Sequence, residues 1–291
     1  MKYAFFPGCV LESAAKEDYL ATVAVAKKLG IELEELDGWT CCGASHVQDI
    51  APEITLATNA RNIALAEEKG LNLLTVCNTC TLMLREAKNE LDNNEKEKNE
   101  VNKKLAQIGK QYRGTTDITH FLWVLIRDYG LDKLKAKVVQ PLTGLRVAEY
   151  YGCHILRPQT EMGFEDYQMP TSLADLISAI GATPIDFSRK LDCCGFHAVY
   201  PAHDSVMQMT GSINKDAATE GADCVVTPCP LCQMQLDMFQ KEAKEVVGGG
   251  KDMPILHMSQ LVGLALGISP AEMGMPKRHL TDTAAVTKFV G

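Results

Sequence analysis

Ten of the eleven cysteines in this chain of 291 residues form two sets of five with the same internal order. Each set begins with a lone cysteine, continues with an adjacent pair followed by glycine, and ends with a C-x2-C pair. The distance from the second thiol of the adjacent pair to the C-x2-C pair is 35 residues in both sets. The first set consists of Cys9, Cys41, Cys42, Cys77 and Cys80, and the second of Cys153, Cys193, Cys194, Cys229 and Cys232.

The adjacent thiols limit the chemistry of each set. A disulfide between neighbouring residues is strained, and a structural zinc ion takes only four ligands in a closed tetrahedron. Ordinary cubane clusters also use four cysteines, whereas two adjacent thiolates can reach two different irons of one cluster. Five cysteines with an adjacent pair therefore predict a polynuclear iron–sulfur site of unusual shape. The alternative is that CNTC and CPLC act as redox dithiols, which leaves the other six cysteines of the two sets without a role.

The elements that must hold these thiols also occur twice. In each half, short β-rich runs alternate with helical stretches and lead into the cysteine groups, a pattern typical of parallel sheets. We therefore predict an α/β fold of two duplicated modules, 1–140 and 141–291, each a parallel-sheet βα unit and the two related by a pseudo-twofold axis. The predicted strands are 2–6, 31–36, 71–76, 145–151, 183–187 and 223–227, and the predicted helices that follow the adjacent pairs span about 51–69 and about 203–221.

Ligand sites in open parallel sheets lie at the carboxyl ends of the strands. Each module should therefore gather its five thiols at one edge of its sheet. Cys224 lies outside both sets and is predicted to be a buried strand residue. His120 and His257 occupy equivalent positions in the two halves, each at the start of a helix, and they are predicted to cap those helices.

The two halves differ in three segments. Residues 84–107 of the first half are highly charged and are predicted to form a longer helix with a solvated or partner-facing surface. The second half carries an insertion of eight residues around 157–168. The segment 268–291 has little periodicity and is predicted to be a docking tail or a wrapped strap.

Composition and hydropathy argue against several classes of protein. The net charge of −8 argues against a nucleic-acid partner, because phosphate binding needs a basic surface. No apolar stretch is long enough for a membrane span, and the N-terminal residues do not form a signal peptide. Free cysteines at this density are expected in a reducing compartment. From these observations alone we expect a soluble, cytoplasmic protein.

The motifs C-x31-CCG-x33-C-x2-C and its C-x39-CCG version resemble the cysteine-rich (CCG) domain family, present twice. With two complete modules the chain resembles, within that family, the B-type catalytic subunit of the heterodisulfide reductases of methanogenic archaea. The resemblance implies two noncubane 4Fe–4S clusters, each bound by the five cysteines of one set, that together reduce the coenzyme M–coenzyme B heterodisulfide to two thiols. It also implies that a ferredoxin-like partner and a flavoprotein partner from the same heterodisulfide reductase complex deliver the electrons.

Other residues near the cysteines are candidates for contact with that substrate. His154 directly follows Cys153 and has no counterpart in the first half, so we consider it for proton supply or substrate contact. The substrate implied by the resemblance is anionic, which favours cations such as Arg157, Arg189 and Lys190. His46 and His197 follow the two adjacent pairs at different offsets, so the repeat does not explain them.

A second function from another class remains open. The chain could instead be a CCG electron-transfer subunit of another redox complex, such as a lactate- or glycolate-oxidising one. A quinone or a flavin partner would then replace the disulfide. Such relatives often lose one of the two motifs, and both are complete here.

Overall fold

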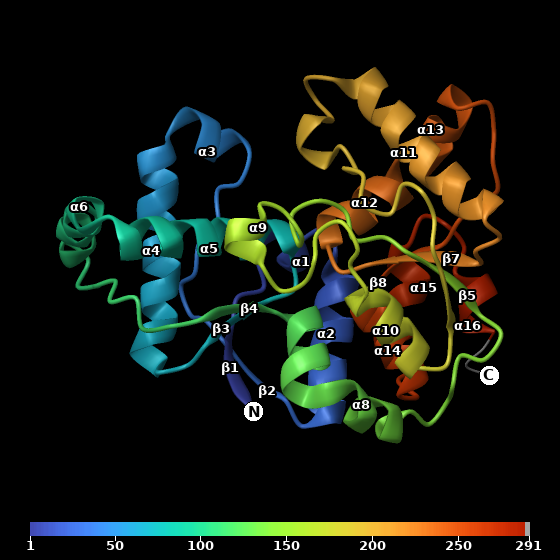
Figure 1. The fold of residues 1–291 in the computed structure, drawn as a ribbon, viewed down its shortest axis with the longest axis horizontal. Coiled ribbons are helices and arrows are strands. Elements are labelled where there is room, and N and C mark those ends of the chain that lie inside the picture. The colour runs from blue at the N-terminus through green and yellow to red at the C-terminus, as the bar shows by residue number, and fades with distance from the viewer. Residues whose placement is uncertain (289–291) are drawn as a thin grey trace.

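Two parallel four-stranded sheets, one from each half of the chain, form the framework of the protein (Figure 1). The computed structural model describes residues 1–288, apart from the side chain of Pro276. The strand orders are β2-β1-β3-β4 and β6-β5-β7-β8, which are the same order once the repeat is taken into account. The strands are β1 (Lys2–Phe5), β2 (Glu32–Glu35), β3 (Leu73–Thr75), β4 (Ile118–His120), β5 (Arg146–Glu149), β6 (Thr183–Ile185), β7 (Cys224–Thr227) and β8 (Ile255–His257).

Helices connect consecutive strands, as parallel pairing requires. In the first half they are α1 (Cys9–Glu12), α2 (Lys16–Leu29), α3 (His46–Ile50), α4 (Pro52–Lys69), α5 (Asn78–Asn93), α6 (Glu95–Ala106), α7 (Phe121–Trp123), the π-helix η1 (Val124–Gly130) and α8 (Leu131–Lys137). In the second half they are α9 (Gln159–Met162), α10 (Ser172–Ala179), the 3₁₀ helix η2 (Phe196–Ala198), α11 (His203–Thr219), α12 (Pro230–Met238), α13 (Gln240–Val246), α14 (Met258–Ala265), α15 (Met275–Arg278) and α16 (Ala284–Thr287).

The two modules share one hydrophobic core. Helix α2 of the first module packs against α14 of the second, and at their contact the buried hydroxyls of Thr22 and Ser259 lie 2.9 Å apart. The same buried cluster contains Val25 and Phe121 from the first half and Leu261 from the second. In Figure 1 these helices lie in the middle of the molecule, while α3–α6 and α11–α13 extend to opposite sides. The modules are therefore held in a fixed relation by buried side chains.

The predicted α/β fold with two duplicated parallel-sheet modules is confirmed. Cys224 is fully buried in β7, as expected. His120 and His257 also cap their helices, because their Nδ1 atoms accept hydrogen bonds from the backbone N–H groups of Leu122 and Ser259 at 3.1 Å and 3.3 Å.

The prediction of one helix over residues 84–107 is wrong. Helix α5 ends at Asn93, and α6 begins at Glu95. Between them, the side-chain oxygen of Asn94 accepts a hydrogen bond from the backbone N–H of Glu97 at 3.2 Å. Asparagine is a strong N-cap residue, so it starts a new helix instead of continuing the old one.

The C-terminal segment wraps over the junction of the modules. Its backbone N–H groups at Leu280 and Thr281 donate to the carboxylate of Asp237 at 2.8 Å and 3.1 Å. Met273 is fully buried and packs at Gly263 of α14. Residues 268–288 thus follow the strap alternative, and residues 289–291 lie outside the described part of the chain.

Candidate metal centre

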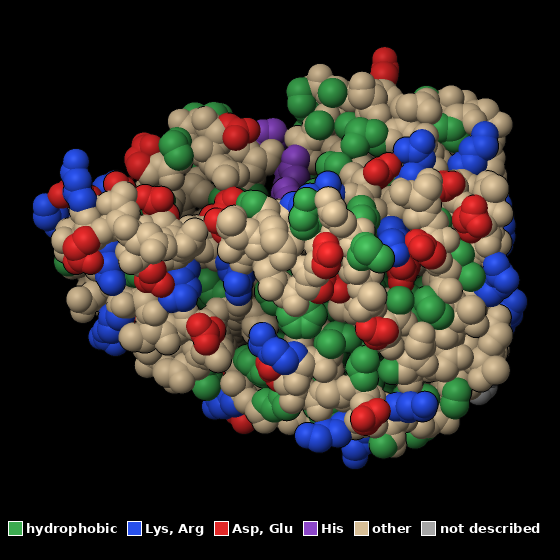
Figure 2. Space-filling view, viewed as in Figure 1, with side chains coloured by type: hydrophobic (Ala, Val, Ile, Leu, Met, Phe, Trp, Pro, Cys, Tyr) green, Lys and Arg blue, Asp and Glu red, His purple; other side chains and the backbone are tan. Residues whose placement is uncertain are grey.

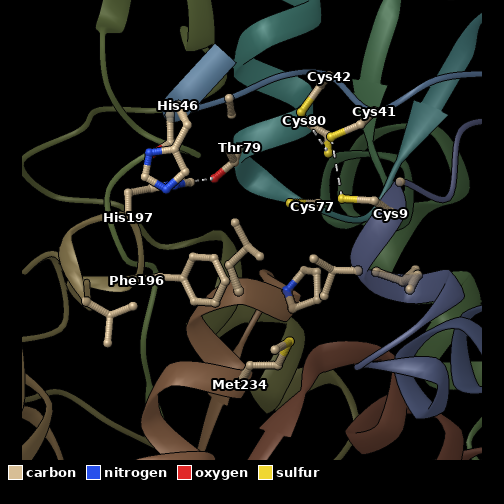
Figure 3. Close-up of a pocket in the computed structure, with 18 of the residues that line it drawn as sticks. Cys9, Cys41, Cys42, His46, Cys77, Thr79, Cys80, Phe196, His197 and Met234 are labelled. Atoms are coloured by element: carbon tan, nitrogen blue, oxygen red, sulfur yellow. Dashed lines mark hydrogen bonds between the residues drawn. The ribbon is translucent and has the colours of Figure 1, made fainter. Parts of the chain in front are cut away.

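The five cysteines of the first set converge at the carboxyl edge of the first sheet. Cys9 begins α1 directly after β1, and the loop that follows β2 carries Cys41 and Cys42. Cys77 is the N-cap of α5, and Cys80 lies in its first turn. All five line one cavity of about 280 Å³ (Figure 3).

Sulfur atoms within this set are in direct contact. The Sγ atoms of Cys9 and Cys41 lie 3.5 Å apart, as do those of Cys42 and Cys80. Hydrogen bonding with the thiols of Cys42 and Cys9 lowers the pKa of Cys41 to about 2. The backbone N–H of Gly43 also donates to the Cys41 sulfur at 3.5 Å. The lowered pKa favours the thiolate form of Cys41, which is the form that binds metals.

The second set repeats this arrangement beside a much smaller space. All five of its cysteines line a second cavity of about 10 Å³. Hydrogen bonds from Cys153 and Cys194 lower the pKa of Cys193 to about 2, and the N–H of Gly195 donates to the Cys193 sulfur at 3.3 Å. The first thiol of each adjacent pair thus has a lowered pKa in both modules, and in the second set the pKa of Cys229 is lowered as well. The two sets therefore present the same five thiols, but the cavity beside the first set is much larger than the cavity beside the second.

A glycine before the lone cysteine of each set makes room for a sulfur atom. Gly8 has φ +78°, and a Cβ there would lie 3.2 Å from the Cys80 sulfur. Gly152 has φ +70°, and a Cβ there would lie 3.0 Å from the Cys232 sulfur. L-residues rarely adopt this backbone region. These two glycines were not among the predicted site residues, although their equivalent positions in the repeat were a usable signal.

The two cysteine sets adjoin at the junction of the modules. Cys77 and Cys229 are equivalent residues, and their Sγ atoms lie 4.0 Å apart. His120 and His257 flank this contact, and burial lowers their pKa values to about 3 and about 4, so both imidazoles are neutral at neutral pH. Among residues 1–288, no three or more His, Cys, Asp or Glu side chains are arranged to hold a single metal ion.

A hydroxyl of the first module joins two histidines of the second. Thr79 Oγ1 lies 2.9 Å from His154 Nδ1 and 3.4 Å from His197 Nε2, and the two imidazoles stack with centroids 5.6 Å apart. Burial lowers the pKa of His197, so its neutral ring can accept a hydrogen bond. In Figure 3, His46 and His197 lie at the same side of the cavity that the first set lines, opposite Cys9 and Cys41. The equivalent of Thr79 is Leu231, so the repeat offered no signal for this contact.

The predicted cationic contacts lie away from both cavities. The guanidinium of Arg157 donates to the backbone carbonyl of Leu191. Arg189 pairs with Asp192 at 3.0 Å, and Lys190 pairs with Glu149 at 2.6 Å. None of the three cations lines either of the cavities described above. Their role in substrate binding stays a prediction.

The open cavity is mainly apolar away from the sulfur atoms. Two residues of α12, Met234 and Met238, face it together with the aromatic rings of Phe196, Tyr200 and Phe239. All five belong to the second module, whereas the cysteines belong to the first. The packing of the two modules therefore creates a ligand-sized apolar space in front of one set of thiols.

Comparison with known proteins identifies the family. The model of the cysteine-rich domain (CCG) matches residues 3–85 and 147–237, which contain all ten cysteines of the two sets. The chain belongs to the cysteine-rich (CCG) domain family. A solved structure of a hypothetical protein from Helicobacter pylori has the same fold, with a TM-score of 0.77 and 16% identity over 97% of this chain and 52% of that one.

Curated relatives of this CCG protein belong to reductase complexes. It is 51% identical to the 8-methylmenaquinol:fumarate reductase membrane anchor subunit of Wolinella succinogenes, over 94% of this chain and 95% of that protein. It is 34% identical to the B subunit of a CoB-CoM heterodisulfide reductase of Methanosarcina acetivorans, over 99% of this chain and 97% of that protein. These likenesses support an oxidoreductase role within a multisubunit complex.

The expectation of a cytoplasmic protein is contradicted by the first of these relatives. A protein that shares half of its residues with this chain over nearly its full length is named a membrane anchor, which points to membrane association. The structure adds that no helix within residues 1–288 is long and apolar enough to cross a bilayer. The expectation rested on the lack of an apolar span, the lack of a signal peptide and the density of free cysteines, and none of these registers a protein that lies on a membrane without spanning it.

Proposed function

We propose that this chain is the iron–sulfur electron-transfer subunit of a multisubunit reductase, with one noncubane 4Fe–4S cluster held by each set of five cysteines. The observation that carries the proposal is that all five thiols of each set line a single cavity. Thiolates are the donors that iron–sulfur clusters require, and the lowered pKa values of Cys41 and Cys193 favour this form at one thiol of each adjacent pair. When bound, such a cluster accepts and passes electrons one at a time.

The open cavity of the first module is the proposed site for an apolar two-electron carrier of the quinol class. Its Met and aromatic side chains would bind the ring and exclude water from it. A quinol that gives up two electrons also releases two protons. The neutral imidazole of His197 at the lip of the cavity can accept a hydrogen bond from the quinol hydroxyl. The 51% identity to a menaquinol:fumarate reductase protein supports this choice.

Reduction of the coenzyme M–coenzyme B heterodisulfide is the second candidate. It is supported by both complete cysteine sets and by 34% identity to a heterodisulfide reductase B subunit. In that case the ferredoxin-like and flavoprotein components of that complex would be the partners. The apolar lining favours the quinol, because the substrate implied by the resemblance is anionic and the three predicted cations lie outside both cavities.

The test begins with iron and labile sulfide in protein purified without oxygen, where about four irons per module are expected. The loaded protein is then given a reduced short-chain menaquinol analogue with an oxidising dye, or the heterodisulfide with a reducing dye. We expect turnover with the quinol. Fast turnover with the heterodisulfide and none with the quinol would establish the second candidate instead, and zinc in place of iron would refute both.

Two variants then distinguish a relay from a two-cluster reaction. Cys41→Ala removes a thiolate of the open cavity and should abolish the dye-linked quinol reaction. Cys193→Ala disturbs the second set and should leave that reaction largely intact, because the dye replaces the relay. If both variants keep their fold and lose the dye-linked quinol reaction equally, both cysteine sets act on one substrate.

A further inference from the structure

Exposed apolar side chains surround the mouth of the open cavity. Tyr200 and Met238 line the cavity, yet they are 87% and 48% exposed. From the other module, Ile50 is 84% exposed and lies one helical turn after His46, which also lines the cavity. Ile54, at the start of α4, is 55% exposed. We call Val47, Ile50, Ile54, Tyr200 and Met238 the apolar rim.

The rim is assembled from two modules, so it is not a by-product of one amphipathic helix. Figure 2 shows a notch that contains histidine side chains, with hydrophobic side chains on the lobes at either side of it. Single exposed apolar residues are normal on a protein surface, but a group of them around one cavity marks an interaction site. The apolar rim therefore indicates a binding partner that has an apolar surface.

The relative that is named a membrane anchor points to a lipid bilayer as this partner, and the charge around the rim limits how the contact could be made. Asp49, Glu53 and Asp204 interrupt the rim, and the whole chain carries −8. A surface of this kind is not attracted to anionic headgroups. Contact with a bilayer would therefore depend on insertion of side chains into the boundary between headgroups and acyl chains, as in proteins that lie on a membrane.

We propose that the apolar rim inserts into one leaflet of a lipid bilayer, so that the cavity of the first module opens toward the membrane interior. This would attach the chain to a membrane although no helix within residues 1–288 can span one. It would also let an apolar carrier pass from the bilayer to the first set of thiols without crossing water. The carrier rests on the proposed function, whereas the membrane contact does not.

The test is flotation of the full-length, iron-loaded protein with phosphatidylcholine vesicles. We expect the wild type to float, with little change between about 0.1 M and about 1 M salt, because apolar insertion is not screened. Ile50→Asp and Ile54→Asp should each weaken binding roughly tenfold, since burial of one such side chain is worth about that much. Neither residue lines the cavity, so the dye-linked reaction with a water-soluble carrier should not change.

Matched controls are exposed apolar residues elsewhere on the surface. Ile108 follows α6 and is 56% exposed, and Val139 follows α8 and is 66% exposed. Ile108→Asp and Val139→Asp introduce the same charge and should bind vesicles as the wild type does. As a second readout, the fluorescence of Ile50→Trp should be quenched by brominated lipids and that of Ile108→Trp should not.

Several results would overturn the proposal. One such result is that the wild type does not float with the vesicles. Another is that the control variants lose as much vesicle binding as Ile50→Asp and Ile54→Asp do. A third is that the wild type binds only vesicles that contain phosphatidylglycerol, and only at low salt. Loss of a co-purifying protein from the Ile50 variant, with vesicle binding unchanged, would instead make the rim a protein interface. Iron content and the soluble-carrier reaction report on the proposed function separately, so the two failures are distinguishable.

Discussion

The glycine before Cys153 offers a sharp test of the second cysteine set. Gly152→Ala places a Cβ 3.0 Å from the Cys232 sulfur, and ordinary contact begins at 3.4 Å. The sulfur must therefore retreat by at least the difference, 0.4 Å. Metal–ligand distances tolerate only about 0.2 Å. We expect Cys232 to be lost as a ligand and the second module to lose its iron.

Backbone strain alone must be separated from this effect. At φ +70° an alanine costs roughly 1–2 kcal/mol wherever it is placed. Gly30 has nearly the same φ, +71°, and a Cβ there meets nothing within 4 Å. Gly30→Ala therefore carries the strain without the sulfur contact and is the matched control.

The assay is iron and sulfide per protein after anaerobic purification, together with the spin resonance signal of each reduced module. Gly152→Ala should retain about half of the wild-type iron, and Gly30→Ala all of it. Full iron in Gly152→Ala would show that Cys232 is not a ligand. Equal iron loss in both variants would show that strain, and not the sulfur contact, is responsible.

Three further predictions concern the module junction, the open cavity and the hydroxyl between the histidines. Asp18 is fully buried, and neither of its carboxylate oxygens has a hydrogen-bond partner among the described residues. Burial, and after it the charge of the neighbouring Glu17, raises the pKa of Asp18 well above 3.8. Its unfolded form loses a proton that the folded form keeps, so the free energy of unfolding should fall as pH rises. Asp18→Asn should therefore gain stability relative to the wild type as pH rises above 3.8, and chemical unfolding of both proteins at several pH values measures this difference; a difference that does not grow with pH would contradict the prediction. Met234→Lys should raise KM for the apolar carrier about tenfold at unchanged iron content, because it buries a charge in an apolar cavity; an unchanged KM would place the carrier elsewhere. Thr79→Val keeps the shape of the side chain but removes its hydrogen bonds to the histidines, so the pH profile of the carrier reaction should shift while iron stays constant; an identical profile would make the contact purely structural.

Most of the architecture could be predicted from the internal repeat. Alternating strands and helices predicted parallel sheets, and residues at the ends of parallel strands must meet at one edge. That argument is local to each module, so the convergence of Cys9, Cys77 and their set members could be predicted from spacing. The break at Asn94 could not, because one polar residue in a charged run decides between one helix and two.

Sequence by itself determined what each module contains: five thiols and a sheet edge to hold them. Only the tertiary structure decided how the modules meet. The 4.0 Å contact between Cys77 and Cys229, the hydroxyl of Thr79 between two histidines, and the unequal cavities all join residues far apart in the chain. Such contacts depend on the packing of α2 against α14, and no periodicity within one module encodes that packing.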